Sequence, residues 1–147
     1  MQVFIENEAG SREKNTFDER SLRLMKTATV SAPYPFPYGF VLGTKSGDGD
    51  AVDCFVLTAR ALPSGATIAC QAIGLLEQIE DGETDHKVIA VPEGEPEAVT
   101  PPQEAALRAF VGAVFAHVPG KTMTVGRLLD REAAEDYVRR CRTAAPP

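Results

Sequence analysis

Residues 54–73 decide the fold and read Cys-Phe-Val-Leu-Thr-Ala-Arg-Ala-Leu-Pro-Ser-Gly-Ala-Thr-Ile-Ala-Cys-Gln-Ala-Ile. The stretch opens with a continuous apolar run over residues 54–58, which is typical of a buried β-strand. The turn residues Pro63-Ser-Gly65 follow, and a second strand pattern covers residues 66–73. Two short strands joined by a turn rather than by a helix favour an antiparallel arrangement over a parallel α/β sheet.

Short strand patterns also occur on both sides of this stretch. Residues 3–5 are apolar, residues 21–25 alternate polar with apolar side chains, and residues 87–91 form an apolar run that Pro92 closes. Gly and Pro turns separate these segments, where a parallel sheet would need helices. The pattern predicts a mainly β (α+β) fold built on a small closed or half-closed antiparallel barrel.

Helical periodicity appears only after an acidic, proline-rich loop over residues 93–102. From Gln103 to Val118 the apolar side chains recur at the spacing of one helix face. We therefore expect a helix that packs on the barrel through this face and ends at Pro119-Gly120.

The C-terminal part of the chain is expected to form one further strand and one further helix. The strand covers residues 123–125, and Asp130 is a suitable N-cap for the helix that follows. The tail over residues 143–147 is expected to be frayed. At 147 residues, the chain has the length of a single domain, which we assign to residues 1–147.

Charge and composition exclude several classes of function. The formal net charge of −6 argues against nonspecific binding to nucleic acid or to an anionic membrane, because both need a basic face. No apolar run approaches the roughly 18 residues of a membrane span, and the N-terminal residues lack a signal-peptide pattern. The three cysteines form no C-x-x-C pair, which favours reduced thiols. We expect a cytoplasmic protein without nucleic-acid or membrane partners.

Three aspartates stand close together at Asp48, Asp50 and Asp53, directly before the buried-strand pattern. Carboxylates held this close repel one another unless a cation neutralises them, and their hard oxygen ligands suit Mg²⁺, Mn²⁺ or Ca²⁺. An EF-hand is excluded, because its fifth and twelfth positions would fall on Val52 and Ala59, which cannot bind calcium through their side chains. The alternative is a polar turn without a metal.

Two further groups of residues suggest a site for an anion. Asp85 and Lys87 enter a strand pattern two positions apart, so both side chains face the same side while His86 faces the other. Tyr34 and Tyr38 lie in an aromatic, proline-rich segment and have hydroxyls that could donate hydrogen bonds to phosphate oxygens. Each group also has a simpler interpretation, as a solvated hairpin or as a loop that only packs.

The order and spacing of these motifs resemble the soluble inorganic pyrophosphatases of the magnesium-dependent, barrel-type family. The likeness is strongest over residues 3–92 and weaker beyond them. The segments that carry it are Ile5-Glu6 with Lys14, Tyr34-Pro35, Tyr38-Gly39, Gly47-Asp-Gly-Asp50 with Asp53, and Asp85-x-Lys87-Val-Ile-Ala-Val-Pro92. The resemblance implies a five-stranded, closed OB-like barrel with one or two packed helices, and hydrolysis of pyrophosphate to two phosphates.

The resemblance also implies which side chains hold metal. The expected cofactor is Mg²⁺, with Mn²⁺ as the alternative, and Asp53 would bridge two of the ions. Asp50 would orient or deprotonate the attacking water. The implied metal ligands are Asp48, Asp53, Asp85, Glu80 and Glu6.

Phosphate oxygens would be contacted by Lys14, Lys26, Tyr38 and Lys87, of which Tyr38 and Lys87 also count as catalytic in the family. Lys26 stands where the family has an arginine and so offers a point charge in place of a bidentate fork.

The chain departs from the family pattern mainly on the phosphate-binding side. Thr16 replaces a glutamate, Glu80 replaces an aspartate, and Ala51 replaces a residue that is normally proline or acidic. A Tyr-Lys pair that follows the helix in the family falls on Val118-Pro119, which cannot donate hydrogen bonds to phosphate through their side chains.

Three hypotheses follow from the matches and the departures. The first is a metal-dependent pyrophosphatase, whose activity could be full or reduced. The second is a non-catalytic member of the family that binds metal, phosphate or a protein partner. The third is a hydrolase of another phosphorylated substrate. The resemblance also implies a homo-oligomer, in bacterial relatives often a hexamer.

Overall fold

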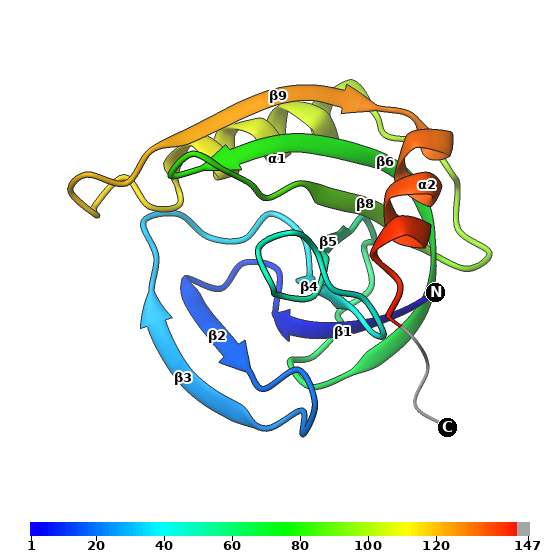
Figure 1. Ribbon diagram of the computed structural model, residues 1–147, viewed down its shortest axis with the longest axis horizontal. Coiled ribbons are helices and arrows are strands. Elements are labelled where there is room, and N and C mark those ends of the chain that lie inside the picture. Colours follow the sequence, from blue (N-terminus) through cyan, green and yellow to red (C-terminus); the bar gives the residue numbers. More distant parts are fainter. Residues whose placement is uncertain (144–147) are drawn as a thin grey trace.

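The computed structural model describes residues 1–143 (Figure 1). The frayed tail expected over residues 143–147 lies outside the described residues, apart from Thr143, whose backbone N–H donates to the carbonyl oxygen of Gly43. Neither helix in the described part has the length and apolar character needed to cross a bilayer. In chain order the elements are β1 (Gln2–Asn7), β2 (Glu13–Phe17), β3 (Leu24–Thr29), β4 (Tyr38–Val41), β5 (Asp53–Val56), β6 (Thr67–Glu80), β7 (Glu83–Thr84), β8 (Lys87–Pro92), α1 (Pro101–Ala113), β9 (Met123–Leu129) and α2 (Arg131–Cys141).

Five strands form a closed hydrogen-bonded ring in the order β1, β4, β5, β8 and β6, with β6 pairing back to β1. The strands range from 4 residues in β4 to 14 residues in β6, so the ring is not evenly barrel-shaped. The predicted five-stranded barrel is therefore confirmed. One pair, β5 with β8, is parallel, because the chain passes through the whole of β6 before β8 returns beside β5.

The sequence did not predict the strands β2, β4 and β7. β4 begins at Tyr38, inside the segment that the sequence describes as an aromatic loop, because Pro35 and Pro37 mask the start of the strand. β2 and β3 form a separate two-stranded sheet that lies beside the ring in Figure 1. β3 corresponds to the strand expected at residues 21–25, but it begins at Leu24. All of its residues are exposed.

β6 is the strand that joins the parts of the molecule. It pairs with β1 and β8 inside the ring, and its far end continues beyond the ring to pair with β7 and β9 (Figure 1). The short strand expected at residues 123–125 is the first part of the longer β9. This extension carries Gln78 and Glu80 out to the open end of the ring, where the pocket described below lies.

α2 begins directly after its predicted cap, whereas α1 begins at Pro101, before the expected start at Gln103 and inside the expected loop over residues 93–102. Thr100 forms a capping box with Gln103 and precedes two prolines at the first helical positions, which suits the start of α1. The side chain of Asp130 accepts from the backbone N–H of Ala133, so the predicted N-cap of α2 is confirmed. α1 ends at Ala113 instead of reaching Pro119-Gly120, and the chain continues in turns through residue 120.

Candidate active site

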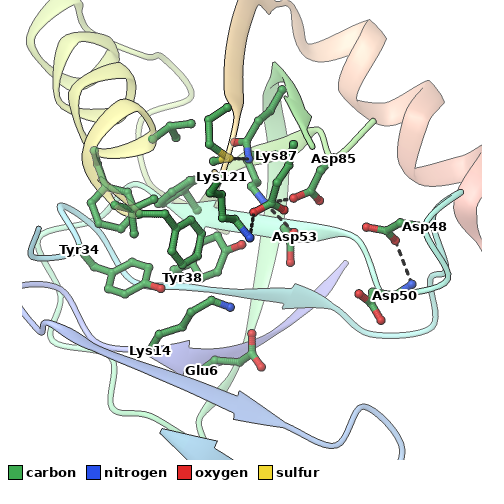
Figure 2. A pocket seen from close by; sticks show the side chains of 18 residues that line it. Glu6, Lys14, Tyr34, Tyr38, Asp48, Asp50, Asp53, Asp85, Lys87 and Lys121 are labelled. Carbon is green, nitrogen blue, oxygen red and sulfur yellow. Dashed lines mark hydrogen bonds and ion pairs between the residues drawn. The ribbon is translucent and has the colours of Figure 1, made fainter. Parts of the chain in front are cut away.

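A single pocket of about 220 Å³ gathers nine of the ten predicted site residues (Figure 2). It lies at one end of the ring, and α1 and the turns after it close one side. The exception is Lys26, which sits on the exposed strand β3 and does not line the pocket. The nine are Glu6, Lys14, Tyr38, Asp48, Asp50, Asp53, Glu80, Asp85 and Lys87.

The acidic turn before β5 supplies three of these side chains. Gly49 has a φ of 91°, a conformation that L side chains rarely adopt, so the turn requires glycine there. Oδ1 of Asp48 accepts a hydrogen bond from the backbone N–H of Asp50 at 2.9 Å. Asp53 is the first residue of β5 and lies opposite Lys87 in the parallel pair β5–β8. Strand pairing therefore brings the acidic turn to the second motif.

Lys87 is the electrostatic centre of the pocket. Its Nζ lies 2.7 Å from Oδ2 of Asp53 and 2.9 Å from Oδ2 of Asp85, and only 8% of the Lys87 side chain is exposed. As the sequence predicts, Asp85 and Lys87 face the same side of their strand (Figure 2). Two carboxylates that share one ammonium in a buried site cannot titrate independently.

The pKa values of the three groups follow from this geometry. Burial would lower the pKa of Lys87, but the charge of Asp53 beside it raises that pKa well above its usual range. Burial, together with the charge of Asp85, raises the pKa of Asp53 in spite of Lys87. Burial also acts to raise the pKa of Asp85, yet the charge and hydrogen bond of Lys87 bring it below its ordinary value. The proton of this cluster is therefore held first by Lys87 and next by Asp53.

Tyr38 forms part of the pocket wall. Its ring packs against Tyr34 at 5.4 Å and against Phe55 at 4.8 Å between centroids, and Lys87 Nζ lies 5.7 Å from its centroid. Burial raises the pKa of Tyr38 well above its usual range. Its hydroxyl is thus protonated at neutral pH and available as a donor.

Glu6 lies on the opposite wall, at the β1 side. Its Oε2 accepts a hydrogen bond from the backbone N–H of Phe17 at 3.0 Å. Burial, aided by the nearby charge of Asp53, raises the pKa of Glu6 to about 7 in spite of that hydrogen bond. A carboxyl with this pKa is partly protonated at neutral pH in the absence of a cation.

This pKa predicts how pH affects the stability of the protein without added metal. The pKa of Glu6 is about 7 in the folded protein and 4.5 ordinarily, so protonation of Glu6 favours the folded state. This contribution to the free energy of unfolding is complete below about pH 4.5 and is lost as pH rises through 7. Glu6→Gln, which mimics the protonated form, should lose less stability between pH 5 and pH 8 and exceed the wild type by about 3 kcal/mol at pH 8. Thermal melts across this range measure the difference.

The matched control is Glu13→Gln, which makes the same chemical change at an exposed residue of β2 that lines no pocket described here. Its melting curves should follow those of the wild type at every pH. Parallel pH curves for Glu6→Gln and the wild type would contradict the burial argument.

The donor set suits a hard divalent cation. All the predicted metal ligands are carboxylates and all line the pocket. Within residues 1–143, however, no three of them stand close enough together to hold one ion. The two that do converge, Asp53 and Asp85, meet at the ammonium of Lys87, which shows that this point favours positive charge.

Lys121 is a pocket residue that the sequence did not reveal. Its Nζ lies 2.8 Å from Oε1 of Glu80 and 4.4 Å from the centroid of Phe115 (Figure 2). Val118, by contrast, is 39% exposed and lines no part of the pocket. Because α1 ends early, the turns after it carry Phe115 and Lys121 to the pocket, and no local motif marks this.

A second residue that the sequence did not reveal, Glu19, lies in a groove next to the pocket. Glu19 shares this groove with Thr16, Glu6 and Asp50, and its Oε2 accepts from the backbone N–H of Ala51 at 2.9 Å. Partial burial and the charges of Asp50 and Asp48 raise its pKa. Glu19 thus brings a carboxylate close to the place where Thr16 offers none. Its position in an ordinary polar turn gave no signal of this.

Comparisons with known proteins agree with the fold. The sequence profile of the inorganic pyrophosphatase family matches residues 3–145. The chain is 37% identical over 98 residues to the inorganic pyrophosphatase of a Nostoc species. The aligned residues make up 65% of this chain and 58% of that protein. The chain is also 29% identical over 150 residues to the inorganic pyrophosphatase of Halalkalibacterium halodurans. That alignment covers 96% of this chain and 92% of the other protein.

Solved structures extend the likeness over almost the whole chain. The inorganic pyrophosphatase of Helicobacter pylori superposes with a TM-score of 0.88 at 25% identity, covering 96% of this chain and 90% of the other. The enzyme of Thermus thermophilus does so with a TM-score of 0.88 at 26% identity, covering 96% and 88%. The sequence profile and the superposed structures agree, and this chain belongs to the inorganic pyrophosphatase family.

Proposed function

We propose that this chain hydrolyses inorganic pyrophosphate to two phosphates with the help of divalent cations. The observation that carries the proposal is the composition of the pocket, in which six carboxylates and the three lysines Lys14, Lys87 and Lys121 surround one small cavity. Because the carboxylates outnumber the lysines, a highly charged anion can enter only together with cations. Membership of the family and the names of the relatives support the same reaction.

The size of the pocket also favours a small inorganic substrate. Its volume of about 220 Å³ lies below the range of roughly 300–1,000 Å³ that is usual for pockets binding drug-sized molecules. The apolar side chains that line it, such as Phe110, Val111 and Val114, are almost fully buried and form its floor rather than a separate subsite.

The proposed cations are Mg²⁺, with Mn²⁺ as the second choice, held by Asp48, Asp53, Asp85, Glu80 and Glu6. Once bound, they would neutralise phosphate charge and lower the pKa of a water molecule.

The other side chains have complementary roles in this proposal. Asp50 accepts the proton of the attacking water, and its place on an exposed turn leaves its carboxylate accessible to that water. Lys14 and Lys87 contact phosphate oxygens as cations, and the protonated hydroxyl of Tyr38 donates to one. Lys26 would contribute only from the exposed strand β3, outside the cavity.

Lys121 adds a third cation to the phosphate-binding side of the pocket. This cation offsets the loss that Val118-Pro119 implies, and it therefore favours an active enzyme over a non-catalytic relative. Lys121→Met should raise the KM for pyrophosphate by about tenfold or more, because a charged hydrogen bond contributes about 1.5–3 kcal/mol. Steady-state kinetics at saturating Mg²⁺ measure this change.

Lys45→Met is the control for Lys121→Met, because Lys45 is exposed and lies outside the pocket. Its KM should equal that of the wild type. An unchanged KM in Lys121→Met would remove Lys121 from the substrate site.

Phosphate release from pyrophosphate with Mg²⁺ tests the proposed function directly, with Asp50→Asn as the inactive reference. The idea fails if the wild-type protein releases phosphate no faster than Asp50→Asn and no faster than a reaction without protein. Calorimetric binding of Mg²⁺ or phosphate without turnover would indicate a non-catalytic member, and faster hydrolysis of a phosphorylated metabolite would indicate another substrate. Assembly into a homo-oligomer, by family resemblance a hexamer, stays a prediction that sedimentation would test. A cytoplasmic location also stays a prediction.

A further inference from the structure

Gln78 of β6 pairs with Val125 of β9 on one side, but on the other side, toward β7 and β8, the pairing of β6 is interrupted at Gln78, next to the pocket. The pairing of β6 with β8 ends at Leu76 opposite Lys87, and the pairing of β6 with β7 begins at Ile79 opposite Thr84. Residues 85 and 86 therefore belong to neither strand. The backbone groups of Gln78 need partners there, because unpaired peptide groups in a buried strand are costly.

One of these partners is a side chain instead of a backbone group. The carbonyl oxygen of Gln78 accepts from the backbone N–H of Asp85 at 2.9 Å, as in an ordinary ladder. The backbone N–H of Gln78 donates to Nδ1 of His86 at 3.0 Å. An imidazole that accepts at Nδ1 carries its proton at Nε2. The His86 ring thus takes the place of a missing carbonyl in the sheet.

The other face of the His86 ring is supported by α2. Its centroid lies 5.5 Å from that of Tyr137, with an angle of 57° between the two planes. The ring therefore lies on the side of the strand away from the pocket, as the alternation of residues 85–87 predicts. It is held by a hydrogen bond from β6 and by an aromatic contact from α2, while Asp85 and Lys87 on either side of it in the sequence face the pocket.

We propose that His86 is a positioning residue, whose Nδ1 acceptor fixes the backbone at residues 85–87 so that Asp85 and Lys87 face the pocket. The inference rests on the proposed function, because it concerns the same acid and lysine. Oδ2 of Asp85 and Nζ of Lys87 are only 2.9 Å apart, so a small rotation of this backbone would separate them. Displacement of catalytic groups by about 1 Å can lower a rate by about 100-fold.

Two substitutions separate the acceptor of His86 from its bulk. His86→Phe keeps a ring against Tyr137 and removes the acceptor. His86→Asn removes the ring but keeps an acceptor. The Oδ1 atom of asparagine is bonded to Cγ, as the Nδ1 atom of histidine is, so it stays within reach of the backbone N–H of Gln78. We expect His86→Phe to lower kcat and the affinity for Mg²⁺ by about tenfold or more, as is typical of residues that support metal ligands. His86→Asn should stay within about threefold of the wild type in both measurements.

Two further measurements separate positioning from general loss of stability. Amide hydrogen exchange at Gln78, followed by NMR, should stay slow in the wild type and in His86→Asn and become fast in His86→Phe. Leu62→Ala removes a buried side chain that lines neither the pocket nor the adjoining groove, and it should lower the melting temperature without changing kcat or Mg²⁺ affinity.

The proposal is overturned if His86→Phe keeps both kcat and Mg²⁺ affinity, or if His86→Asn loses them as His86→Phe does. The second result would assign the effect to the ring and its contact with Tyr137. If the wild-type protein does not hydrolyse pyrophosphate, the proposed function fails, while Mg²⁺ affinity and the exchange of the Gln78 amide still decide the role of His86.

Discussion

Asp50→Asn is expected to lower kcat for pyrophosphate hydrolysis by about 10²–10⁴-fold, which is the usual contribution of a general base. The carboxylate of Asp50 lines the pocket, and none of the described residues donates a hydrogen bond to it or forms an ion pair with it. Its backbone groups, which bond to Ser46 and Asp48, are unchanged by the substitution. The variant should therefore lose activity and keep the stability of the wild type.

Activity and thermal melts of the same preparations test this expectation. Glu83→Gln serves as control, because it neutralises another exposed acidic residue, and the Glu83 side chain does not line the pocket. Its kcat should equal that of the wild type. An Asp50→Asn variant with full activity would show that another group takes the proton of the attacking water. A large drop in its melting temperature would mean that the turn depends on the Asp50 carboxylate.

Lys87→Met is expected to have the largest effect on stability. The substitution keeps much of the side-chain length but leaves Asp53 and Asp85 facing each other without a cation, and breaking a buried ion pair costs about 3–5 kcal/mol. In a protein of this size the melting temperature should fall by about 10 °C at pH 8 without added metal. The loss should be smaller at pH 5, because protonation of Asp53, whose pKa is already raised, removes the repulsion.

Mg²⁺ should stabilise Lys87→Met more than the wild type, since a divalent cation can neutralise the two carboxylates in place of the ammonium. Melting temperatures with and without Mg²⁺ measure this difference, and Lys45→Met again supplies the surface control. Turnover should stay low even when Mg²⁺ restores stability, because the variant lacks a donor to phosphate. An unchanged melting temperature in the absence of metal would contradict the ion-pair argument.

Much of the fold could be predicted because its signals are local. The apolar runs at β5 and β8, the turn at residues 63–65 and the Asp130 cap each fall within a few neighbouring residues. The errors have local causes too. Prolines mask the start of β4, and neither the partly buried β2 nor the exposed β3 alternates buried with exposed residues.

The residues of the candidate site also divide into those with a local sequence signal and those without one. The acids at 48, 50 and 53 and the pair at 85 and 87 could be found because their motifs are short and ordered along the chain. Lys121 and Glu19 could not, since each is an ordinary turn residue whose neighbours in the pocket or groove come from other elements. His86 was recognised as facing away from the pocket, but its acceptor role depends on a gap in the β6 ladder.

Periodicity and motif spacing are properties of neighbouring residues, so they were enough to predict a mainly β barrel, the acidic turn and the resemblance to the pyrophosphatase family. The ion pair between Asp53 and Lys87, 34 residues apart, becomes visible only once the chain is folded. The same is true of Lys121, which supplies a cation beside Glu80. These contacts depend on the parallel pairing of β5 with β8 and on where α1 ends. Both are set by packing of the whole chain, for which no short segment carries a signal.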